Sequence, residues 1–203
     1  MLSIPPLRIA TPRLIIRCRQ PSDAALSKEA VDSSLEHLRP WMPWAHEAPS
    51  SLETVAELLA KFARDFEEGR EFVYGVYSRN ESELLGCAGL HLRNGETDRE
   101  IGYWLRTSAT GRGFITEAAA ALTSAAFATW PELWTVTIVC DPANTRSAAV
   151  PARLGYACLG NLPAKVTSPT RSLDQIWQTT REAWQAAAVT VAAGNEALTG
   201  VEA

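Results

Sequence analysis

Apolar side chains alternate with other residues at the start of the chain, and the pattern then changes to helical spacing. The run "PRLIIRCR", residues 12–19, predicts a β-strand with every second apolar side chain on one face. That set is Leu14, Ile16 and Cys18. A polar turn follows, in which Ser22 or Asp23 can cap a helix that runs to about Ser33.

The most regular amphipathic pattern lies between residues 50 and 69. Ser50 and Glu53 have the spacing of a capping box, which satisfies backbone N–H groups at a helix start. Apolar side chains then recur every three or four residues, as on the buried face of a helix: Leu52, Val55, Leu59, Phe62 and Phe66. The preceding segment 38–49, "LRPWMPWAHEAP", contains three prolines, so we expect a loop there.

Three strand-like runs follow in close succession, at residues 71–78, 83–93 and 99–107. Short polar segments separate them, which predicts an antiparallel meander. A glycine turn then leads into a predicted helix at 113–129. The run "LWTVTIVC", residues 133–140, is rich in β-branched side chains and is typical of a buried strand.

The last elements are shorter. We expect a helix from about Asn144 to Leu154, and the segments 156–161 and 173–180 can pair as a final hairpin. Residues 183–203 are rich in alanine and weakly patterned, which predicts a terminal helix or a tail.

No internal repeat and no linker divides the chain, so we expect one domain over residues 1–182. The order of elements predicts an α/β (α+β) fold, with a mixed, mostly antiparallel sheet and one central crossover. Helices would flank this sheet.

The charge balance bears on the binding partner. The chain has 203 residues, 19 of them basic and 23 acidic, with a formal net charge of −4. Proteins that bind nucleic acid contact its phosphates through clustered Lys and Arg, and no such cluster is present in the sequence. We therefore expect a partner other than nucleic acid.

The cysteine pattern bears on location and metal binding. Cys18, Cys87, Cys140 and Cys158 have no metal-ligand spacing and no C-x-x-C motif, so we expect buried free thiols and no metal site. The N-terminal residues lack the apolar core of a secretory signal, and no run has the roughly 20 apolar residues of a membrane span. We expect a cytoplasmic protein with no membrane partner.

One short segment, "TSATGRGFITEAA" (108–120), points to chemistry. A helix N-terminus has backbone N–H groups without helical partners and the positive end of the helix dipole, so it suits an anion. Gly111 and Gly113 permit a close approach to the chain, and Arg112 adds positive charge. The spacing matches neither a P-loop nor the dinucleotide fingerprint. A turn that only joins a strand to a helix would explain the two glycines equally well.

About 30 residues later comes "NTRSAAVPARLGY". The order of these motifs resembles the GNAT superfamily of acyl-CoA-dependent N-acetyltransferases, in particular the branch typified by RimJ and RimL, which acetylate N-terminal amines of ribosomal proteins. The likeness covers nearly the whole domain. It runs through "TPRLIIR", "LRPWMPW", "EIGYWL", "GRGFITEAA" and "NTRSAAVPARLGY".

The resemblance implies a GNAT-like fold whose sheet is splayed between its fourth and fifth strands, at 100–105 and 133–140. It implies that acetyl-CoA lies in the gap, with its pyrophosphate on the glycine turn. Asn144 would contact the pantetheine arm and Ser147 would lie near the thioester. The implied cofactor contacts are Thr110, Gly111, Arg112, Gly113, Phe114, Ile115, Thr116, Asn144 and Ser147.

Three positions depart from the family pattern. The family usually has Gln or Arg in place of Thr110, and Gly or Ala in place of Ile115, whose larger side chain would crowd the pyrophosphate. Many members carry a tyrosine general acid where this chain has Pro151, which cannot supply a proton. Pro151 also removes a backbone donor from the short helix, so we expect a kink there.

Acetyl transfer requires a neutral amine, donors for the carbonyl oxygen and a proton for the thiolate. Glu100 is the first candidate base, and His91 or His46 are alternatives. Ser147 is the candidate proton donor to sulfur. The candidate walls of the acceptor pocket are Trp41, Trp44, His91, Tyr103 and Trp104.

The sequence therefore predicts an acetyl-CoA-dependent N-acetyltransferase, without a metal, that acts on a protein N-terminus or a small amine. Two alternatives stay open: a non-catalytic acyl-CoA sensor on the same fold, and a nucleotide-binding module that uses the same turn. Relatives often dimerise, so a homodimer is possible.

Overall fold

The computed structural model describes residues 3–168 and 171–187. Its elements, with η for a 3-10 helix, are β1 (Arg8–Ala10), β2 (Leu14–Cys18), η1 (Pro21–Asp23), α1 (Ala24–Asp32), α2 (Leu35–Leu38), η2 (Pro43–His46), α3 (Leu52–Glu67), β3 (Phe72–Ser78), β4 (Leu84–His91), β5 (Asp98–Leu105), η3 (Thr107–Ala109), α4 (Phe114–Thr129), β6 (Thr135–Cys140), α5 (Thr145–Arg153), β7 (Ala157–Ser168) and β8 (Arg171–Thr180). Residues 181–187 are also helical. Most of the predicted tail, residues 188–203, lies outside the described residues.

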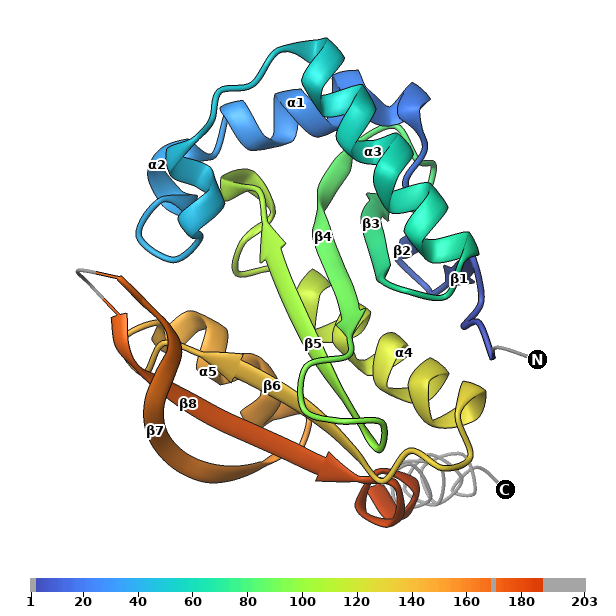
Figure 1. Ribbon diagram of the computed structural model, residues 1–203, viewed down its shortest axis with the longest axis vertical. Coiled ribbons are helices and arrows are strands. Elements are labelled where there is room, and N and C mark those ends of the chain that lie inside the picture. Colours follow the sequence, from blue (N-terminus) through green and yellow to red (C-terminus); the bar gives the residue numbers. More distant parts are fainter. Residues whose placement is uncertain (1–2, 169–170, 188–203) are drawn as a thin grey trace, which may run out of the picture.

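The described strands form one sheet in the order β1-β2-β3-β4-β5-β6-β8-β7 (Figure 1). Neighbouring strands are antiparallel except β5 and β6, which are parallel. Helix α4 makes the crossover between these two, because parallel neighbours cannot be joined by a tight hairpin. The predicted α/β domain with a mixed, mostly antiparallel sheet is confirmed.

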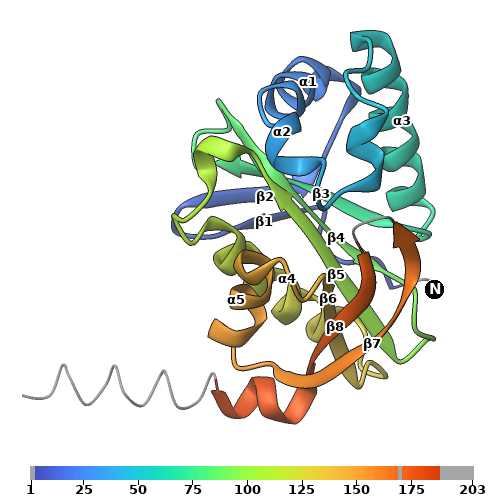
Figure 2. The same ribbon diagram turned by 90° about the vertical axis from the view of Figure 1, so that its left-hand side faces the viewer.

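Helices cover both faces of the sheet. Figure 2 shows α1, α2 and α3 on one side, and α4 and α5 on the other. The alternation in β2 explains this: Leu14 and Ile16 are fully buried in the cluster that includes α4, whereas Ile15 packs with Tyr77 and Ala30 on the α1 side. The predicted face of β2 is correct, but its opposite face is buried as well.

The two parallel strands separate to form a fork. They pair only at Asp98↔Thr135, Arg99↔Val136 and Glu100↔Thr137, although β5 continues to Leu105 and β6 to Cys140. Figure 1 shows them starting side by side and diverging into a V. The predicted splay is therefore present, between the fifth and sixth strands because β1 was not predicted.

Asp98 closes the narrow end of this fork. Its carboxylate is buried and accepts hydrogen bonds from the hydroxyls of Thr135 and Thr137, both at 2.6 Å, and from Asn94 Nδ2 at 3.1 Å. A buried carboxylate is tolerated when several donors satisfy it. These bonds join β5 to β6 where the gap begins.

Several local predictions need correction. The N-cap of α3 is Ser51, whose Oγ accepts the Thr54 N–H at 3.0 Å, instead of the capping box predicted for Ser50 and Glu53. Asp23 is at the N-cap of α1 without capping it, because its carboxylate binds Arg17 and the Gln20 N–H.

Two further predictions were incomplete. The proline-rich segment expected to be a loop begins with the last residue of α2 and contains the short helix η2. Three cysteines are buried as predicted, but Cys158 is exposed on β7. All four are free thiols. Within the described part of the chain, no helix has the length and apolar character to span a membrane.

Candidate active site

A cleft of about 970 Å³ opens at the wide end of the fork. Its walls come from β5, the start of α4, α5 and the segment around α2. The lining residues are Arg13, His37, Leu38, Trp41, Met42, Tyr103, Trp104, Leu105, Thr110, Gly111, Gly113, Ile115, Thr116, Glu117, Ala120, Asn144, Thr145, Arg146, Ser147, Ala149, Val150, Arg153 and Leu154. This volume is at the upper end of the range for small-molecule sites.

The N-terminus of α4 forms one end of the cleft. Gly111 and Gly113 have φ values of +73° and +76°, a left-handed conformation that residues with a Cβ rarely adopt. The first helical bond of α4 runs from Glu117 N–H to Gly113 O. Within the described residues, no backbone N–H from Gly111 to Thr116 has a protein acceptor. Of the residues that carry these donors, Gly111, Gly113, Ile115 and Thr116 line the cleft. They lie at the positive end of the helix dipole, which suits an anionic group.

Two arginines flank this helix start. Phe114 is 8% exposed, and the guanidinium carbons of Arg13 and Arg112 lie 4.9 and 4.7 Å from its ring centroid. Arg13 also donates to Glu117 at 2.6 Å and to the Arg112 carbonyl at 3.0 Å. Such cation–π contacts hold the guanidinium groups in place. The buried Phe114 therefore positions positive charge beside the unpaired N–H groups.

Glu117 links the first turn of α4 to the turn between β1 and β2. Its carboxylate accepts from the Thr11 hydroxyl at 2.6 Å and from the Arg13 backbone N–H at 3.1 Å. Burial acts to raise the pKa of Glu117, but these hydrogen bonds and Arg13 outweigh it and hold that pKa below its usual range. Glu117 therefore stays ionised and anchors the Arg13 side chain.

Helix α5 forms the opposite wall. Asn144 is its N-cap and accepts the Ser147 N–H through its side-chain oxygen at 3.1 Å. The helix continues through Pro151 to Arg153. Proline has no N–H, so the carbonyl of Ser147, four residues earlier, lacks its helical donor.

Tyr103 of β5 supplies the missing donor. Its hydroxyl donates to the Ser147 carbonyl at 3.0 Å and accepts from Ser147 Oγ at 3.3 Å. Burial raises the pKa of Tyr103 well above its ordinary value, so the phenol stays protonated at neutral pH. Tyr103 thus links β5 to α5 across the fork and fixes the position of Ser147.

An aromatic group packs on the opposite face of the sheet from Tyr103, because Trp104 is the next residue of β5. Trp104 lines the cleft and packs against Trp44, with 5.8 Å between ring centroids. Trp41 and His37 line the same wall. Burial, with a smaller contribution from the Arg146 charge, lowers the pKa of His37 below its usual value, so neutral imidazole is favoured there.

Glu100 and His91 are paired residues of β5 and β4, and they share one face of the sheet. Glu100 is 7% exposed and its carboxylate lies 2.5 Å from Arg93 Nη1. His91 Nδ1 lies 2.6 Å from Glu71 Oε2. Neither Glu100 nor His91 lines the cleft itself; both lie where the two strands begin to separate.

The structure thus brings most of the predicted residues together. The predicted residues that line the cleft are Trp41, Tyr103, Trp104, Thr110, Gly111, Gly113, Ile115, Thr116, Asn144 and Ser147. Arg112, Phe114, Trp44, His91 and Glu100 lie beside it without lining it. The roles assigned to all of these residues stay predictions.

Comparison with known protein families identifies the family to which this forked sheet and its cleft belong. Residues 13–157 match the model of the acetyltransferase (GNAT) domain family. The chain belongs to the GNAT acetyltransferase family. The family predicted from the sequence motifs is therefore confirmed, and the match extends over the fork, the start of α4 and all of α5.

Relatives within the GNAT family include ribosomal-protein acetyltransferases. The chain is 32% identical over 145 residues to the protein of Bacillus subtilis named "Putative ribosomal N-acetyltransferase YdaF", covering 70% of this chain and 77% of that protein. It is 25% identical over 159 residues to the ribosomal protein uS5-alanine N-acetyltransferase of Escherichia coli, covering 76% of this chain and 80% of the relative.

Solved GNAT structures share the fold. The ribosomal L7/L12 α-N-protein acetyltransferase RimL, solved with coenzyme A, superposes with a TM-score of 0.74 at 20% identity, covering 89% of this chain and 99% of RimL. The ribosomal protein S5-alanine acetyltransferase of Vibrio fischeri gives a TM-score of 0.75 at 19% identity, with coverage of 88% and 99%.

Sequence reasoning missed Arg13, Glu117 and Glu71 around this GNAT cleft, and it did not pair the predicted residues Tyr103 and His91 with their partners. Arg13 and Glu117 are 104 residues apart in the chain, and Glu71 and His91 are 20 apart, so no local pattern pairs them. One signal was available for Tyr103: Pro151 leaves a carbonyl that needs a donor from another element. Among the described residues, no group of three or more His, Cys, Asp or Glu side chains is arranged to hold a metal ion.

Proposed function

We propose that this GNAT protein transfers the acetyl group of acetyl-CoA to a primary amine. The observation that supports this most directly is the row of unpaired N–H groups from Gly111 to Thr116, which faces a cleft at the mouth of a forked sheet. These donors suit a pyrophosphate. The free edge of β5 beyond Glu100 suits an extended, amide-containing arm.

The charges in the cleft also fit acetyl-CoA. Three arginines line it, Arg13, Arg146 and Arg153, against the single carboxylate of Glu117 in the same lining. The cofactor carries several phosphate charges, and guanidinium groups are well suited to bind phosphate. Asn144 Nδ2 and Ser147 Oγ offer further donors and acceptors on the α5 side.

When bound, acetyl-CoA supplies an acetyl group activated as a thioester. In the proposed mechanism, the N–H groups of the α4 turn and the arginines hold its phosphates, and the edge of β5 aligns its arm. A base near Glu100 and His91 removes the proton of the incoming amine. The Ser147 hydroxyl, whose proton points to Tyr103 in this structure, rotates toward the departing sulfur, donates a hydrogen bond to it and returns a proton to it.

The acceptor is proposed to be the N-terminal amine of a protein, with small amines as the second class. The named activities of the relatives in Bacillus subtilis and Escherichia coli favour ribosomal proteins. The wall formed by Trp41 and Trp104, with Trp44 packed against Trp104, suits an extended peptide with an apolar residue near its N-terminus. A cytoplasmic location and a homodimer stay predictions.

Two measurements test the function. Calorimetry with acetyl-CoA and with ATP should show micromolar or tighter binding of acetyl-CoA and no comparable binding of ATP. Tight ATP binding without acetyl-CoA binding would refute the proposal and favour a nucleotide-binding module.

Release of free CoA thiol should then be followed over a panel of N-terminal peptides from ribosomal proteins, free lysine, polyamines and aminoglycosides. Peptide N-termini are expected to give the highest kcat/KM. Acetyl-CoA binding without thiol release over the whole panel would instead favour an acyl-CoA sensor, the alternative suggested by Pro151 and Ile115.

A further inference from the structure

We propose that His91, oriented by Glu71, is the general base that accepts the proton of the acceptor amine. This inference rests on the proposed acetyl-transfer function and adds a residue role to it. It starts from the contact of 2.6 Å between His91 Nδ1 and Glu71 Oε2. A carboxylate at Nδ1 keeps the neutral imidazole proton on that nitrogen, which leaves the lone pair on Nε2.

Two glycines make room for the imidazole ring directly on the sheet. A Cβ at Gly89 would lie 2.7 Å from His91 Nε2, and a Cβ at Gly102 would lie 3.3 Å from the same atom. Gly89 and Gly102 are register partners on β4 and β5. Any larger residue at Gly89 would displace the ring, so this pair of glycines permits His91 to lie flat toward the fork.

The register places Nε2 at the beginning of the gap. Gly102 is two residues beyond Glu100, the last residue of β5 that pairs with β6. The next residue on the same face is Trp104, a wall of the cleft about 7 Å further along the strand. The lone pair of Nε2 therefore lies between the closed end of the fork and the aromatic wall proposed to hold the acceptor.

The neighbouring carboxylate is less suited to the role. Glu100 is 7% exposed and its carboxylate is already paired with Arg93 at 2.5 Å, so the guanidinium occupies an oxygen that would otherwise accept the amine proton. Nε2 of His91 has no hydrogen-bond partner in the part of the chain that the structure describes. The His91 side chain is 14% exposed, which is enough to pass a proton on to water.

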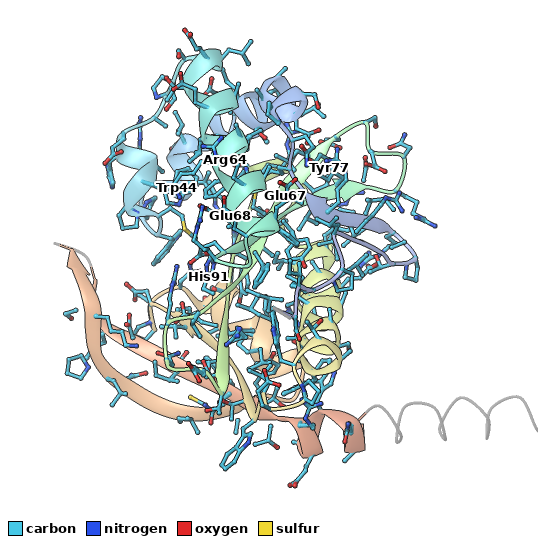
Figure 3. All side chains as sticks on the ribbon, turned by 45° about the vertical axis from the view of Figure 1, so that its right-hand side comes forward. Trp44, Arg64, Glu67, Glu68, Tyr77 and His91 are labelled. Atoms are coloured by element: carbon cyan, nitrogen blue, oxygen red, sulfur yellow. The ribbon has the colours of Figure 1, made fainter. Side chains whose placement is uncertain are left out.

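Several charged groups face this corner, and the pH dependence must be judged against all of them. Figure 3 shows His91 beneath the C-terminal end of α3, where Arg64, Glu67 and Glu68 are labelled.

The groups facing the His91–Glu71 pair from other elements are Glu100 on β5, Arg93 after β4 and Asp65 on α3. Burial acts to raise the pKa of Glu71, but His91 outweighs it, so this pKa lies below the usual range and Glu71 stays ionised.

The proton balance is simple. At neutral pH the acceptor arrives as an ammonium group, and His91 Nε2 takes one proton from it. The amine lone pair then forms the new C–N bond, the C–S bond breaks, and its electron pair stays on sulfur. The second amine proton reaches sulfur through Ser147. Imidazolium at His91 returns its proton to water, with Glu71 stabilising the positive charge meanwhile.

Three isosteric variants test the proposal: His91→Gln, Glu71→Gln and Glu100→Gln. With one peptide acceptor, His91→Gln should lower kcat at least a hundredfold and remove the acid limb of the pH–kcat profile. Glu71→Gln should lower kcat about tenfold, because the imidazolium that forms on His91 loses its counter-charge. Glu100→Gln should leave the acid limb of the pH–kcat profile in place, because His91 and not Glu100 is proposed to accept the proton. Calorimetric affinity for acetyl-CoA should be the same in all three.

A readout without acetyl-CoA accompanies the kinetics. The chain has only three histidines, so the imidazole proton signals can be assigned by their loss in single variants. The neutral His91 ring should carry its proton on Nδ1 in the wild type, and the ring nitrogen chemical shifts in long-range 15N–1H spectra report which nitrogen is protonated. A wild-type acid limb that persists in His91→Gln, or is lost in Glu100→Gln, overturns the proposal.

A neutral wild-type His91 ring that carries its proton on Nε2 overturns it as well. A wild type that binds no acetyl-CoA or acetylates no amine overturns the proposed function and this inference together. An active wild type with an unaffected His91→Gln variant overturns only the inference.

Discussion

At the scale of single residues, the most informative pair is Pro151 and Tyr103. A proline inside α5 leaves the Ser147 carbonyl without a helical donor, and the Tyr103 hydroxyl fills that place at 3.0 Å. The departure from the family pattern at position 151 therefore has a structural counterpart on β5. The two residues should behave as a coupled unit in unfolding experiments.

Tyr103→Phe should lower the free energy of unfolding by about 1–2 kcal/mol, because it removes a hydrogen bond and leaves a carbonyl unsatisfied. In a Pro151→Ala background the cost should fall by about 1 kcal/mol, since residue 151 then supplies its own N–H. Urea denaturation of the wild type, Tyr103→Phe, Pro151→Ala and the double variant measures the cost of Tyr103→Phe in both backgrounds. Tyr74→Phe is the matched control, because the Tyr74 hydroxyl donates to the distant Pro6 carbonyl at 3.0 Å and should cost the same in both backgrounds. Equal Tyr103→Phe costs in the two backgrounds would show that the residues are independent.

Ser147 is the second residue for which the geometry makes a prediction. Its Oγ is bound to Tyr103 and lies in the cleft wall, whereas its N–H caps the helix through Asn144. Ser147→Ala keeps the cap and removes only the hydroxyl, so kcat should fall about ten- to a hundredfold with acetyl-CoA affinity little changed. Steady-state kinetics and calorimetry separate the two effects. An unaltered kcat would remove the serine from the chemistry.

At the scale of elements, the start of α4 carries the proposed cofactor site. Gly111 has a φ of +73°, and a Cβ there would meet nothing within 4 Å. Gly111→Asn and Gly111→Asp are nearly isosteric, and both residues tolerate a left-handed backbone better than most. Their difference therefore reports charge alone. We expect the Asp variant to bind acetyl-CoA at least tenfold more weakly than the Asn variant by calorimetry, and equal affinities would mean that no anion lies at this turn.

The elements also show what the sequence could and could not supply. Apolar periodicity predicted α3, α4 and the meander β3–β5, because burial on one face imposes a spacing on the sequence. It missed β1, whose three residues are too few to show alternation. It placed the α3 cap one residue early, because Ser50 and Ser51 are chemically equivalent and only the backbone course selects between them.

The site was predictable where one segment forms it, and less so where distant segments meet. The glycine turn and the Asn144–Ser147 cap are local, and the structure has both at the cleft. The contacts Arg13–Glu117, Tyr103–Ser147 and Glu71–His91 join separate elements. Tertiary packing alone brings such partners together, so a single sequence shows the residues without showing which ones pair.

At the scale of the whole molecule, acid stability depends on carboxylates distributed over the fold. In most of them burial acts to raise the pKa but hydrogen bonds and nearby cations outweigh it; in the others the cations themselves dominate. The carboxyl groups with lowered pKa values are Asp23, Asp65, Glu71, Glu81 and Glu117. Asp23 joins β2 to η1, Asp65 joins α3 to the following turn, and Glu117 joins α4 to the turn between β1 and β2. Protonation would therefore loosen several junctions at once.

The sign of the pH effect follows from these shifts. A carboxyl group with a lower pKa in the folded state takes up its proton first in the unfolded chain, so its stabilisation is complete above the ordinary carboxyl range and is lost as the pH falls through the folded value. His37, whose pKa is also lowered, acts in the same direction at higher pH. The free energy of unfolding should therefore be nearly constant from pH 8 to about 7, decline slightly toward pH 5.5, and fall steeply below about pH 5.

Urea unfolding from pH 3 to 8 measures this profile. Asp23→Asn and Glu117→Gln should each lower stability at pH 7 and flatten the acid decline, because the group that gains the extra proton on unfolding is gone. Glu57→Gln is the control: Glu57 is exposed on α3 and makes no ion pair among the described residues, so its profile should match the wild type. An acid decline as steep in Asp23→Asn and Glu117→Gln as in the wild type would mean that these junctions do not govern acid stability. The response would then have to come from groups elsewhere in the fold, because linkage allows no pH dependence without a difference in bound protons.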